Sequence, residues 1–362
     1  MREGAFNSMK AFNYKSIFVF GFLFIIMTFT INVAEADQNL NNNNLEQINE
    51  YIETEMQRYN IPGLALGIIK DGEIIHLKGY GRADETGRKV TPETPFLIGS
   101  LSKSFTALGI MQLVEEKKIN LNESVKEYLP WFELKNEEAS EKITVENLLR
   151  HTSGFSTYQG FEVWRPHTKS NFGKEDIKEN LKDIELAYNP GEKYKYSNAN
   201  YIILGQIIEE VSGKTYSEYI KKNIFEPLDM ENSYVSLKEA VGNNLATGYR
   251  SWFGFNVPYE QIYPQGAISA GYIISSAEDM TKYLRLYLNK GKYRNKRIIS
   301  ELQLNKMFQA SPKHPGSYGL GWGVMRNSVG HTGENSNFIS HMRIDFSNNN
   351  LAYIILYNIG DQ

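Results

Sequence analysis

The feature that most constrains the fold is a predicted helix that is apolar on nearly every side, in the segment SLSKSFTALGIMQLVEEKK from Ser100 onward. Leu101, Phe105, Leu108 and Met111 recur at helical spacing but do not leave a broad polar face. A helix of this kind is buried among other elements. We therefore expect a central helix inside a large core, which a chain of 362 residues can supply.

β-Rich segments lie at both ends of the chain. LALGIIKDGEIIHLKGYG holds two runs around Asp71-Gly72, a strong hairpin signal. Near the end, SNFISHMRIDF places alternate apolar side chains on one face, and SNNN turns into LAYIILY. Few strand signals occur between them. We expect a sheet part at about 45–119 and 265–362, and a helical part at about 120–264.

Residues 1–36 have the order of a secretory signal peptide, with two lysines, the apolar run IFVFGFLFIIMTF and a small-residue cleavage site ending at Ala36. We expect cleavage after Ala36, a polar spacer at 37–44 and a folded domain at 45–362 that opens with a helix in LEQINEYIETEMQRYN. An uncleaved membrane anchor is the alternative, although the apolar run is short for a full span. Either interpretation predicts a secreted or extracytoplasmic protein of the cell envelope.

Composition excludes several kinds of chemistry. The chain has no cysteine, so disulfides, thiolate metal sites and cysteine nucleophiles are ruled out. A net charge of -3 with dispersed basic residues predicts no nucleic-acid partner. His151 has no second ligand at a suitable spacing and is expected to hold a loop rather than a metal. No cofactor and no metal are expected.

Ser100 and Lys103 are three residues apart and share one face of the predicted helix. A serine hydroxyl needs a base, and a lysine buried at a helix N-terminus has its charged form disfavoured by desolvation and by the helix dipole. The same helix end offers a backbone N–H to an oxyanion. This spacing is common by chance, and a serine cap beside a solvated lysine is the alternative. The apolar helix that follows favours the catalytic interpretation.

Two downstream segments supply partners. Tyr196 and Asn198 precede an apolar helix in YKYSNANYIILG, and a phenol held between two amines can act as a second base or shuttle a proton. The HTG segment at 331–333 lies at the edge of the last strands, where its glycine lets a substrate approach and the N–H of Glu334 is placed to complete an oxyanion hole. A loop tyrosine and a strand-end turn are the alternatives.

In this order, the three motifs resemble those of the serine β-lactamase and penicillin-binding-protein superfamily, in its class C and esterase-like branch. The segments ITVENLLRHTSGF, PGEKYKYSNANYIILGQIIEEVSGKTY, GAISAGYIISSAEDM and YGLGWGV are similar to further family signatures. The resemblance runs from about residue 44 to the end. It implies an α+β fold in which an antiparallel sheet is flanked by helices, with a mainly helical region beside it and the active site in the cleft between.

The resemblance also implies roles for the motif residues. Ser100 is then the acylated nucleophile, Lys103 its base and Tyr196 the proton shuttle in acylation and deacylation. GENSNF is similar to a pattern in membrane-tethered members that remove an acyl-D-asparagine group from natural-product precursors. The expected substrate-binding residues are Asn198, His331, Thr332, Gly333, Glu334 and, through that pattern, Asn335 and Asn337.

One departure narrows the expected function. His331 stands where β-lactamases and many carboxypeptidases carry lysine, and histidine is mostly neutral at neutral pH. A substrate carboxylate would therefore find a weaker positive charge at this position than a lysine provides. This favours an esterase, an aminopeptidase or another amidase. We therefore expect a serine hydrolase that forms an acyl-enzyme on Ser100 and cleaves a peptide, amide or ester bond, including bonds to D-amino acids. The alternative is a catalytically weak protein that binds penicillin or cell-wall peptides.

Partners and specificity are less constrained. A small-molecule or peptide substrate is expected, and membrane attachment through an uncleaved N-terminus or a missing C-terminal segment stays open, because the sequence stops at LYNIGDQ where the family usually continues into a helix. The segments YQGFEVWRPHTKS and YRSWFGFNVPYEQIY are expected to be cleft loops that set specificity. Their aromatic residues predict a pocket wall, with a packed loop core as the alternative.

Overall fold

The computed structural model describes residues 42–163, 172–260, 262–311, 313, 318–347 and 350–360. The expected signal peptide lies outside the described residues. The chain divides into a first unit that ends at Ile61 and a second that runs from Pro62 to Gly360. In the first unit, helix α2 (Asn42–Arg58) forms where the apolar spacing predicts a helix. None of the described helices is long and apolar enough to span a lipid bilayer.

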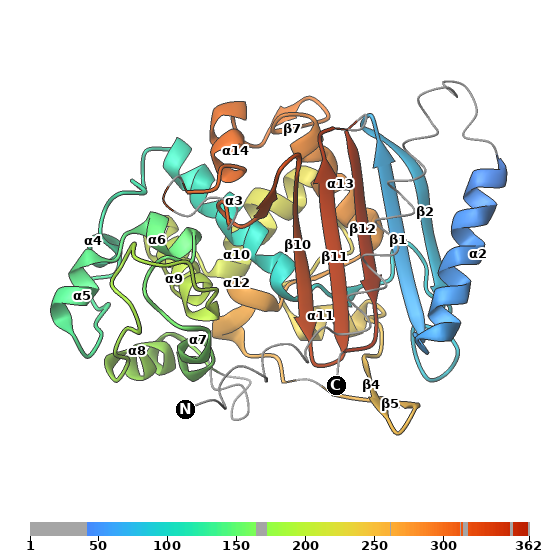
Figure 1. The fold of residues 1–362 in the computed structure, drawn as a ribbon, viewed down its shortest axis with the longest axis horizontal. Coiled ribbons are helices and arrows are strands. Elements are labelled where there is room, and N and C mark those ends of the chain that lie inside the picture. The colour runs from blue at the N-terminus through green and yellow to red at the C-terminus, as the bar shows by residue number, and fades with distance from the viewer. Residues whose placement is uncertain are drawn as a thin grey trace, which may run out of the picture. The chain divides into compact units, whose positions relative to one another are not determined.

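A six-stranded sheet forms the frame of the second unit, in the order β2-β1-β12-β11-β10-β9. Every neighbouring pair is antiparallel, and Leu64 opposite Tyr357 joins strands from the two ends of the chain. This confirms the predicted α+β class and its antiparallel sheet (Figure 1). The strands are β1 (Gly63–Lys70), β2 (Glu73–Gly81), β9 (Gly323–Met325), β10 (Ser328–Asn335), β11 (Phe338–Asp345) and β12 (Leu351–Tyr357).

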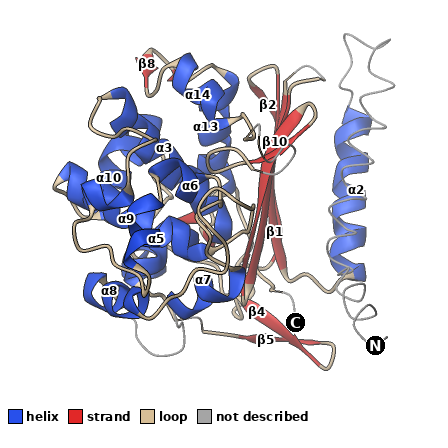
Figure 2. Ribbon diagram, turned by 60° about the vertical axis from the view of Figure 1, so that its left-hand side comes forward, coloured by secondary structure: helices blue, strands red, loops and turns tan. Residues whose placement is uncertain are grey.

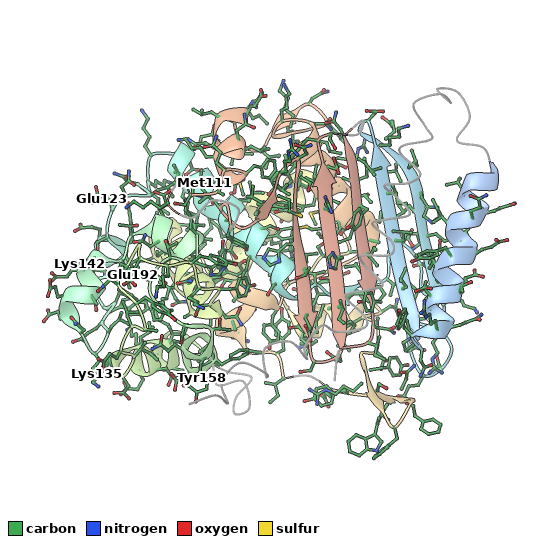
Figure 3. The ribbon with its side chains drawn as sticks, viewed as in Figure 1. Met111, Glu123, Lys135, Lys142, Tyr158 and Glu192 are labelled. Carbon is green, nitrogen blue, oxygen red and sulfur yellow. The ribbon has the colours of Figure 1, made fainter. Side chains whose placement is uncertain are left out.

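Helices from α3 to α14 lie on one face of this sheet (Figure 2). Helix α3 (Ser102–Glu115) is buried from Ser102 to Met111, as its apolar sequence predicts, and the Met111 side chain points into the interior (Figure 3). The other helices of the second unit are α4 (Val125–Tyr128), α5 (Glu137–Lys142), α6 (Val145–Leu149), α7 (Thr157–Val163), α8 (Lys174–Lys182), α9 (Asn198–Ser212), α10 (Tyr216–Ile220), α11 (Leu237–Gly242), α12 (Ile268–Gly271), α13 (Ala277–Leu288) and α14 (Glu301–Met307).

The part expected to be helical, residues 120–264, also contains a hairpin of β4 (Tyr249–Trp252) and β5 (Phe255–Pro258). Two-residue pairs complete the strands: β3 (Phe96–Leu97) with β6 (Ile274–Ser275), and β7 (Lys292–Tyr293) with β8 (Lys296–Arg297). The β4–β5 hairpin was not expected, because its strands are only four residues long and its alternation is interrupted by Gly254 and Pro258.

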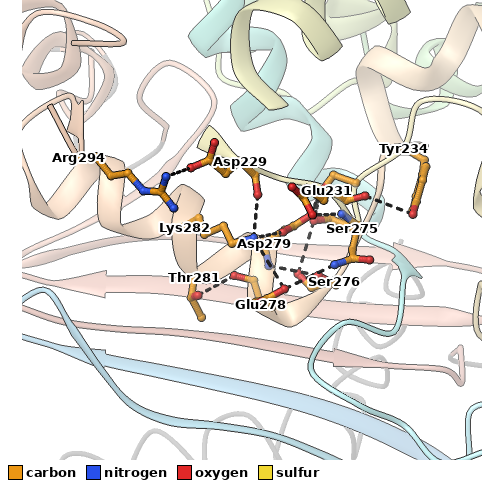
Figure 4. A network of polar contacts seen from close by, with 12 residues as sticks. Asp229, Glu231, Tyr234, Ser275, Ser276, Glu278, Asp279, Thr281, Lys282 and Arg294 are labelled. Carbon is orange, nitrogen blue, oxygen red and sulfur yellow. Dashed lines mark hydrogen bonds and ion pairs between the residues drawn. The ribbon is translucent and has the colours of Figure 1, made fainter. Parts of the chain in front are cut away.

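A serine caps the start of α13, and the carboxylate three residues later is buried. Ser276 caps the helix by accepting a hydrogen bond from the backbone N–H of Asp279 at 3.2 Å. The Asp279 carboxylate does not return to the cap. It accepts hydrogen bonds from the Asn232 N–H (2.7 Å) and the Ser233 hydroxyl (2.8 Å), and it pairs with Lys282 (2.8 Å). This buried network ties the helical part to α13 (Figure 4).

Candidate active site

Ser100 and Lys103 lie together where the sheet meets the central helix. Ser100 is partly exposed in a 3₁₀ turn, Gly99–Leu101, that leads into α3. Lys103 is fully buried one turn later, with its Nζ 2.9 Å from the Ser100 Oγ. The Nζ also donates a hydrogen bond to the Ala270 carbonyl of α12. Burial holds the pKa of Lys103 well below its ordinary value, so the neutral amine is available as a proton acceptor.

Tyr196 reaches the same point from the loop before α9. Its hydroxyl is hydrogen-bonded to Ser100, and the Lys103 Nζ lies 4.9 Å from the centre of its ring. Burial raises the pKa of Tyr196 above its ordinary value, so the phenol keeps its proton at neutral pH. A neutral phenol next to a neutral amine relays protons and does not carry a phenolate charge.

His331 faces Tyr196 across the site, with the two ring centres 6.2 Å apart. The Tyr318 hydroxyl lies 2.6 Å from His331 Nε2, and Nδ1 lies 2.6 Å from the Thr332 carbonyl. Because a carbonyl accepts, Nδ1 carries the proton and Nε2 accepts from Tyr318. Burial and the nearby Lys103 lower the pKa of His331 to about 3. The prediction that two amines flank Tyr196 is therefore wrong. Lys103 is an amine, but His331 on the opposite side is a neutral imidazole.

Strand β10 approaches the Ser100 turn closely. A Cβ on Gly99 would lie 2.5 Å from the Glu334 backbone nitrogen, and one on Gly333 would lie 2.1 Å from the Ile98 carbonyl oxygen. Gly99 also has a φ of 51°, which favours glycine. The Glu334 amide is thus held beside the turn that carries Ser100.

The edge of β10 is open next to this site. Strand β9 pairs only with Ser328–Gly330, so residues 331–335 have β11 on one side and, within the described part of the chain, no strand on the other. The side chains of Thr332 and Glu334 are exposed. An extended substrate can therefore lie along this edge.

The three asparagines predicted to bind substrate lie in different places. Asn198 begins α9 two residues after Tyr196, and its buried Oδ1 has no hydrogen-bond partner among the residues that the structure describes. Asn335 donates a hydrogen bond to the Gly271 carbonyl at the end of α12 (3.2 Å). Asn337 is buried in the β10–β11 turn and donates to the Tyr259 carbonyl (2.7 Å). The structure therefore places Asn198 two residues from Tyr196, one of the predicted catalytic residues, and directs the Asn337 amide toward the segment after β5.

Other residues of the site lie in the signature segments, but their contacts could not be predicted. His151 of HTSGF is buried, and its Nδ1 lies 3.2 Å from the Ser197 nitrogen and 2.9 Å from the Asn200 Nδ2. Its ring centre is 4.3 Å from that of Tyr196, so it positions the Tyr196 loop. Tyr318 of YGLGWGV orients His331. Among the described residues, no cluster of histidines and carboxylates is arranged to hold a metal ion.

This geometry can be compared with known proteins. Residues 48–361 match the Beta-lactamase family. The chain belongs to that family. Protein flp of Staphylococcus aureus is 29% identical over 327 residues, which cover 89% of this chain and 65% of flp. The chain thus spans somewhat less than two thirds of the length of these curated relatives. Teichoic acid D-alanine hydrolase, also of Staphylococcus aureus, is 34% identical over 208 residues, covering 56% of this chain and 47% of that protein.

The chain is also similar in fold to solved structures. The octameric penicillin-binding protein homologue from Pyrococcus abyssi superposes with a TM-score of 0.75 at 32% identity, covering 87% of this chain and 73% of that one. FmtA from Staphylococcus aureus superposes with a TM-score of 0.71 at 26% sequence identity. The match covers 86% of this chain and 84% of FmtA. A class C β-lactamase superposes with a TM-score of 0.73 at 20% sequence identity and is similar in fold. The match covers 88% of this chain and 91% of the β-lactamase.

Proposed function

We propose that this β-lactamase-family chain is an extracytoplasmic serine hydrolase that forms an acyl-enzyme on Ser100 and releases a D-amino acid, such as D-alanine, from an ester. The observation that carries the proposal is a neutral His331 beside a complete Ser100–Lys103–Tyr196 set. Penicillins and peptides ending in D-amino acids present a carboxylate, which a fixed cation binds best. A D-alanyl ester presents no carboxylate, so it needs no such cation.

The likeness to teichoic acid D-alanine hydrolase supports the same substrate class. That protein's name describes the removal of D-alanine from a polymer to which it is bound. The match includes only about half of either chain. The substrate is therefore proposed from the chemistry of the site in this chain, and the activity of that protein is not assigned to it.

Acylation follows from the hydrogen bonds around Ser100. The Ser100 hydroxyl gives its proton to the neutral Lys103 Nζ as the oxygen attacks the ester carbonyl. The backbone N–H groups of Ser100 and Glu334 stabilise the oxyanion. When the tetrahedral intermediate collapses, the alkoxide leaves with a proton delivered from Lys103 through the Tyr196 hydroxyl. The products of this step are the acyl-enzyme and a free alcohol.

Deacylation uses the same groups in reverse. Lys103, neutral again, accepts a proton from water through Tyr196 as the water oxygen attacks the acyl carbon. Ser100 then leaves and recovers its proton, and the free acid is released. No charged phenolate is required, in agreement with the raised pKa of Tyr196.

The proposal is tested with the full chain and D-alanylated lipoteichoic acid as substrate. We expect D-alanine to be released by the wild type and not by Ser100→Ala, with both proteins showing the same thermal unfolding. Intact-mass spectrometry with a fluorophosphonate should show one adduct on the wild type and none on Ser100→Ala. An adduct without D-alanine release would reject the D-alanyl substrate but keep the nucleophile, whereas equal labelling of both proteins would reject Ser100.

A penicillin-binding protein with slow turnover is the second candidate, and the likeness to the penicillin-binding protein homologue from Pyrococcus abyssi favours it. Incubation with benzylpenicillin separates the two. A penicilloyl adduct on Ser100 that persists for hours, together with no D-alanine release, would establish the second candidate.

A further inference from the structure

The β4–β5 hairpin presents aromatic side chains to solvent. Trp252 is 66%, Phe253 85% and Phe255 73% exposed. The hairpin projects beyond the ends of the sheet strands β10 to β12 in both ribbon views (Figures 1 and 2). These three aromatics therefore form neither the pocket wall nor the packed loop core expected for YRSWFGFNVPYEQIY, whereas Tyr249 and Tyr263 of that segment are buried. Isolated two-stranded hairpins are marginal in water, and exposed apolar patches mark interaction sites.

The strand register gathers the apolar groups on one face. Arg250 pairs with Val257 and Trp252 with Phe255, so these four side chains share a face, and Val257 is 43% exposed. No residue from Ser251 to Tyr259 is charged. The tip is thus an uncharged aromatic surface, with the cation of Arg250 at its base.

The turn at the tip adds an independent observation. Phe253 and Gly254 connect the strands with φ values of 46° and 82°. Two-residue turns of this kind favour Asn-Gly or Asp-Gly, because both positions lie in the left-handed region. Phenylalanine is disfavoured there, yet Phe253 is more exposed than Trp252 or Phe255 and packs edge-on against Trp252, with ring centres 5.2 Å apart. An outlier of this kind points to a use for the side chain outside the fold.

The base of the hairpin is held rigidly. Arg250 Nε donates to the Ser336 carbonyl (3.2 Å) and its guanidinium lies 3.3 Å from the Tyr259 ring centre. Asn337 donates to the Tyr259 carbonyl, and Gly248 lies so close to Asn337 that an added Cβ would be 2.2 Å from its Nδ2. The hairpin is therefore fixed to the β10–β11 turn, a few residues from the Gly333–Glu334 edge of the site.

We propose that the tip of this hairpin, Trp252, Phe253 and Phe255, inserts into the interface of a lipid membrane. The three side chains expose about 450 Å², since a large aromatic side chain buries roughly 200 Å² in full. A stable protein–protein interface needs about 800 Å² from each partner, so the tip is too small and too convex for a second copy of the chain. Tryptophan is favoured at membrane–water interfaces, and an uncharged tip enters them without burying an ion.

The N-terminal sequence is consistent with this location. The apolar run at residues 17–29 is predicted to be either a signal peptide or a membrane anchor, and both bring the chain to a membrane. The inference does not depend on the chemistry at Ser100. Hydrolysis of a small soluble ester therefore serves as a control for the fold of each variant.

The test uses the full chain with vesicles of phosphatidylcholine and phosphatidylglycerol that carry brominated acyl chains. Bromine quenches only tryptophan within the bilayer, so quenching reports insertion of Trp252 even if another segment also binds the membrane. Trp252 is one of four tryptophans, and we expect emission to fall by at most about a quarter. Trp252→Phe keeps an aromatic tip and should lose this quenching.

A double variant, Phe253→Ser with Phe255→Ser, should reduce quenching of Trp252 about tenfold, because each change removes apolar area from the membrane contact. Leu302→Ser is the matched control: Leu302 is 66% exposed on α14, and its loss should change nothing. An unquenched wild type, or quenching that persists in Trp252→Phe, would overturn the proposal. So would a wild-type dimer in size-exclusion chromatography that the double variant dissociates, because a second copy would then cover the hairpin.

Discussion

Replacing Gly333 by alanine should lower turnover about a hundredfold. The new Cβ would lie 2.1 Å from the Ile98 carbonyl oxygen and 2.3 Å from the Ser340 Oγ, whereas packed atoms lie roughly 3.5 Å apart. Both neighbours are fixed, because the Ser340 hydroxyl donates to that same carbonyl at 2.7 Å. β10 must therefore shift by about 1 Å from the Ser100 turn. A misplacement of this size costs about 10²-fold in rate, and the overpacking costs about 1–3 kcal/mol of stability.

The assay is kcat/KM for a small soluble ester, with the free energy of unfolding measured in urea. Gly242→Ala is the matched control, because no described residue outside its own stretch of helix lies within 4 Å of the new Cβ. We expect this variant to keep full activity. Gly99→Ala would place a Cβ 2.5 Å from the Glu334 nitrogen, between the Ser100 turn and β10. This variant should show the same loss of kcat/KM. A folded Gly333→Ala protein with activity within about threefold of the wild type would refute the reasoning.

Further substitutions test the charges of the site and its surroundings. His331→Lys should speed acylation by benzylpenicillin about tenfold, because a cation attracts its carboxylate, and should slow D-alanine release; intact-mass time courses measure the first. Lys103→Met should abolish acylation and raise Tm, since an apolar chain of similar length replaces a buried amine. The unfolding free energy should fall from about pH 6.5 to about pH 3, because the folded pKa values of His331 (about 3) and His341 (about 4) lie below that of an unfolded histidine, so the unfolded state binds protons first. His341→Gln should flatten this fall in urea titrations. Asn337→Ala should lower stability by about 1 kcal/mol and leave soluble-ester turnover unchanged; a raised KM would make Asn337 a substrate-binding residue after all.

The sheet and the central helix could be predicted because their signals are local and repeated. The helix from Ser102 is apolar on every side, and Asp71-Gly72 marks the first hairpin directly. The β4–β5 hairpin could not be predicted in the same way. Alternation in RSWFGFNVP shows which side chains share a face, but only the tertiary structure shows that nothing in the described fold covers Trp252 and Phe255.

Which residues of the site lie close together could be predicted only where they are near in sequence. Ser100 and Lys103 are one helical turn apart, so their contact follows from helix geometry. The hydrogen bond between Tyr318 and His331 follows from no local rule, because it depends on how the chain enters β9 and β10. The sequence also could not predict that the pKa of Tyr196 is raised, because burial sets that shift. The second amine expected beside Tyr196 is instead His331, which burial keeps neutral.

Burial connects the mechanism of the site with its choice of substrate. Lys103 contacts the Ser100 hydroxyl and the Ala270 carbonyl, both uncharged, so a buried ammonium would lack a counter-ion and the neutral base is favoured. The same low polarity holds His331 neutral, with its two nitrogens engaged by Tyr318 and Thr332. With His331 held neutral, its side chain offers no cation to a substrate carboxylate. This neutral site is the reason why we propose an acyl donor without that carboxylate as the substrate.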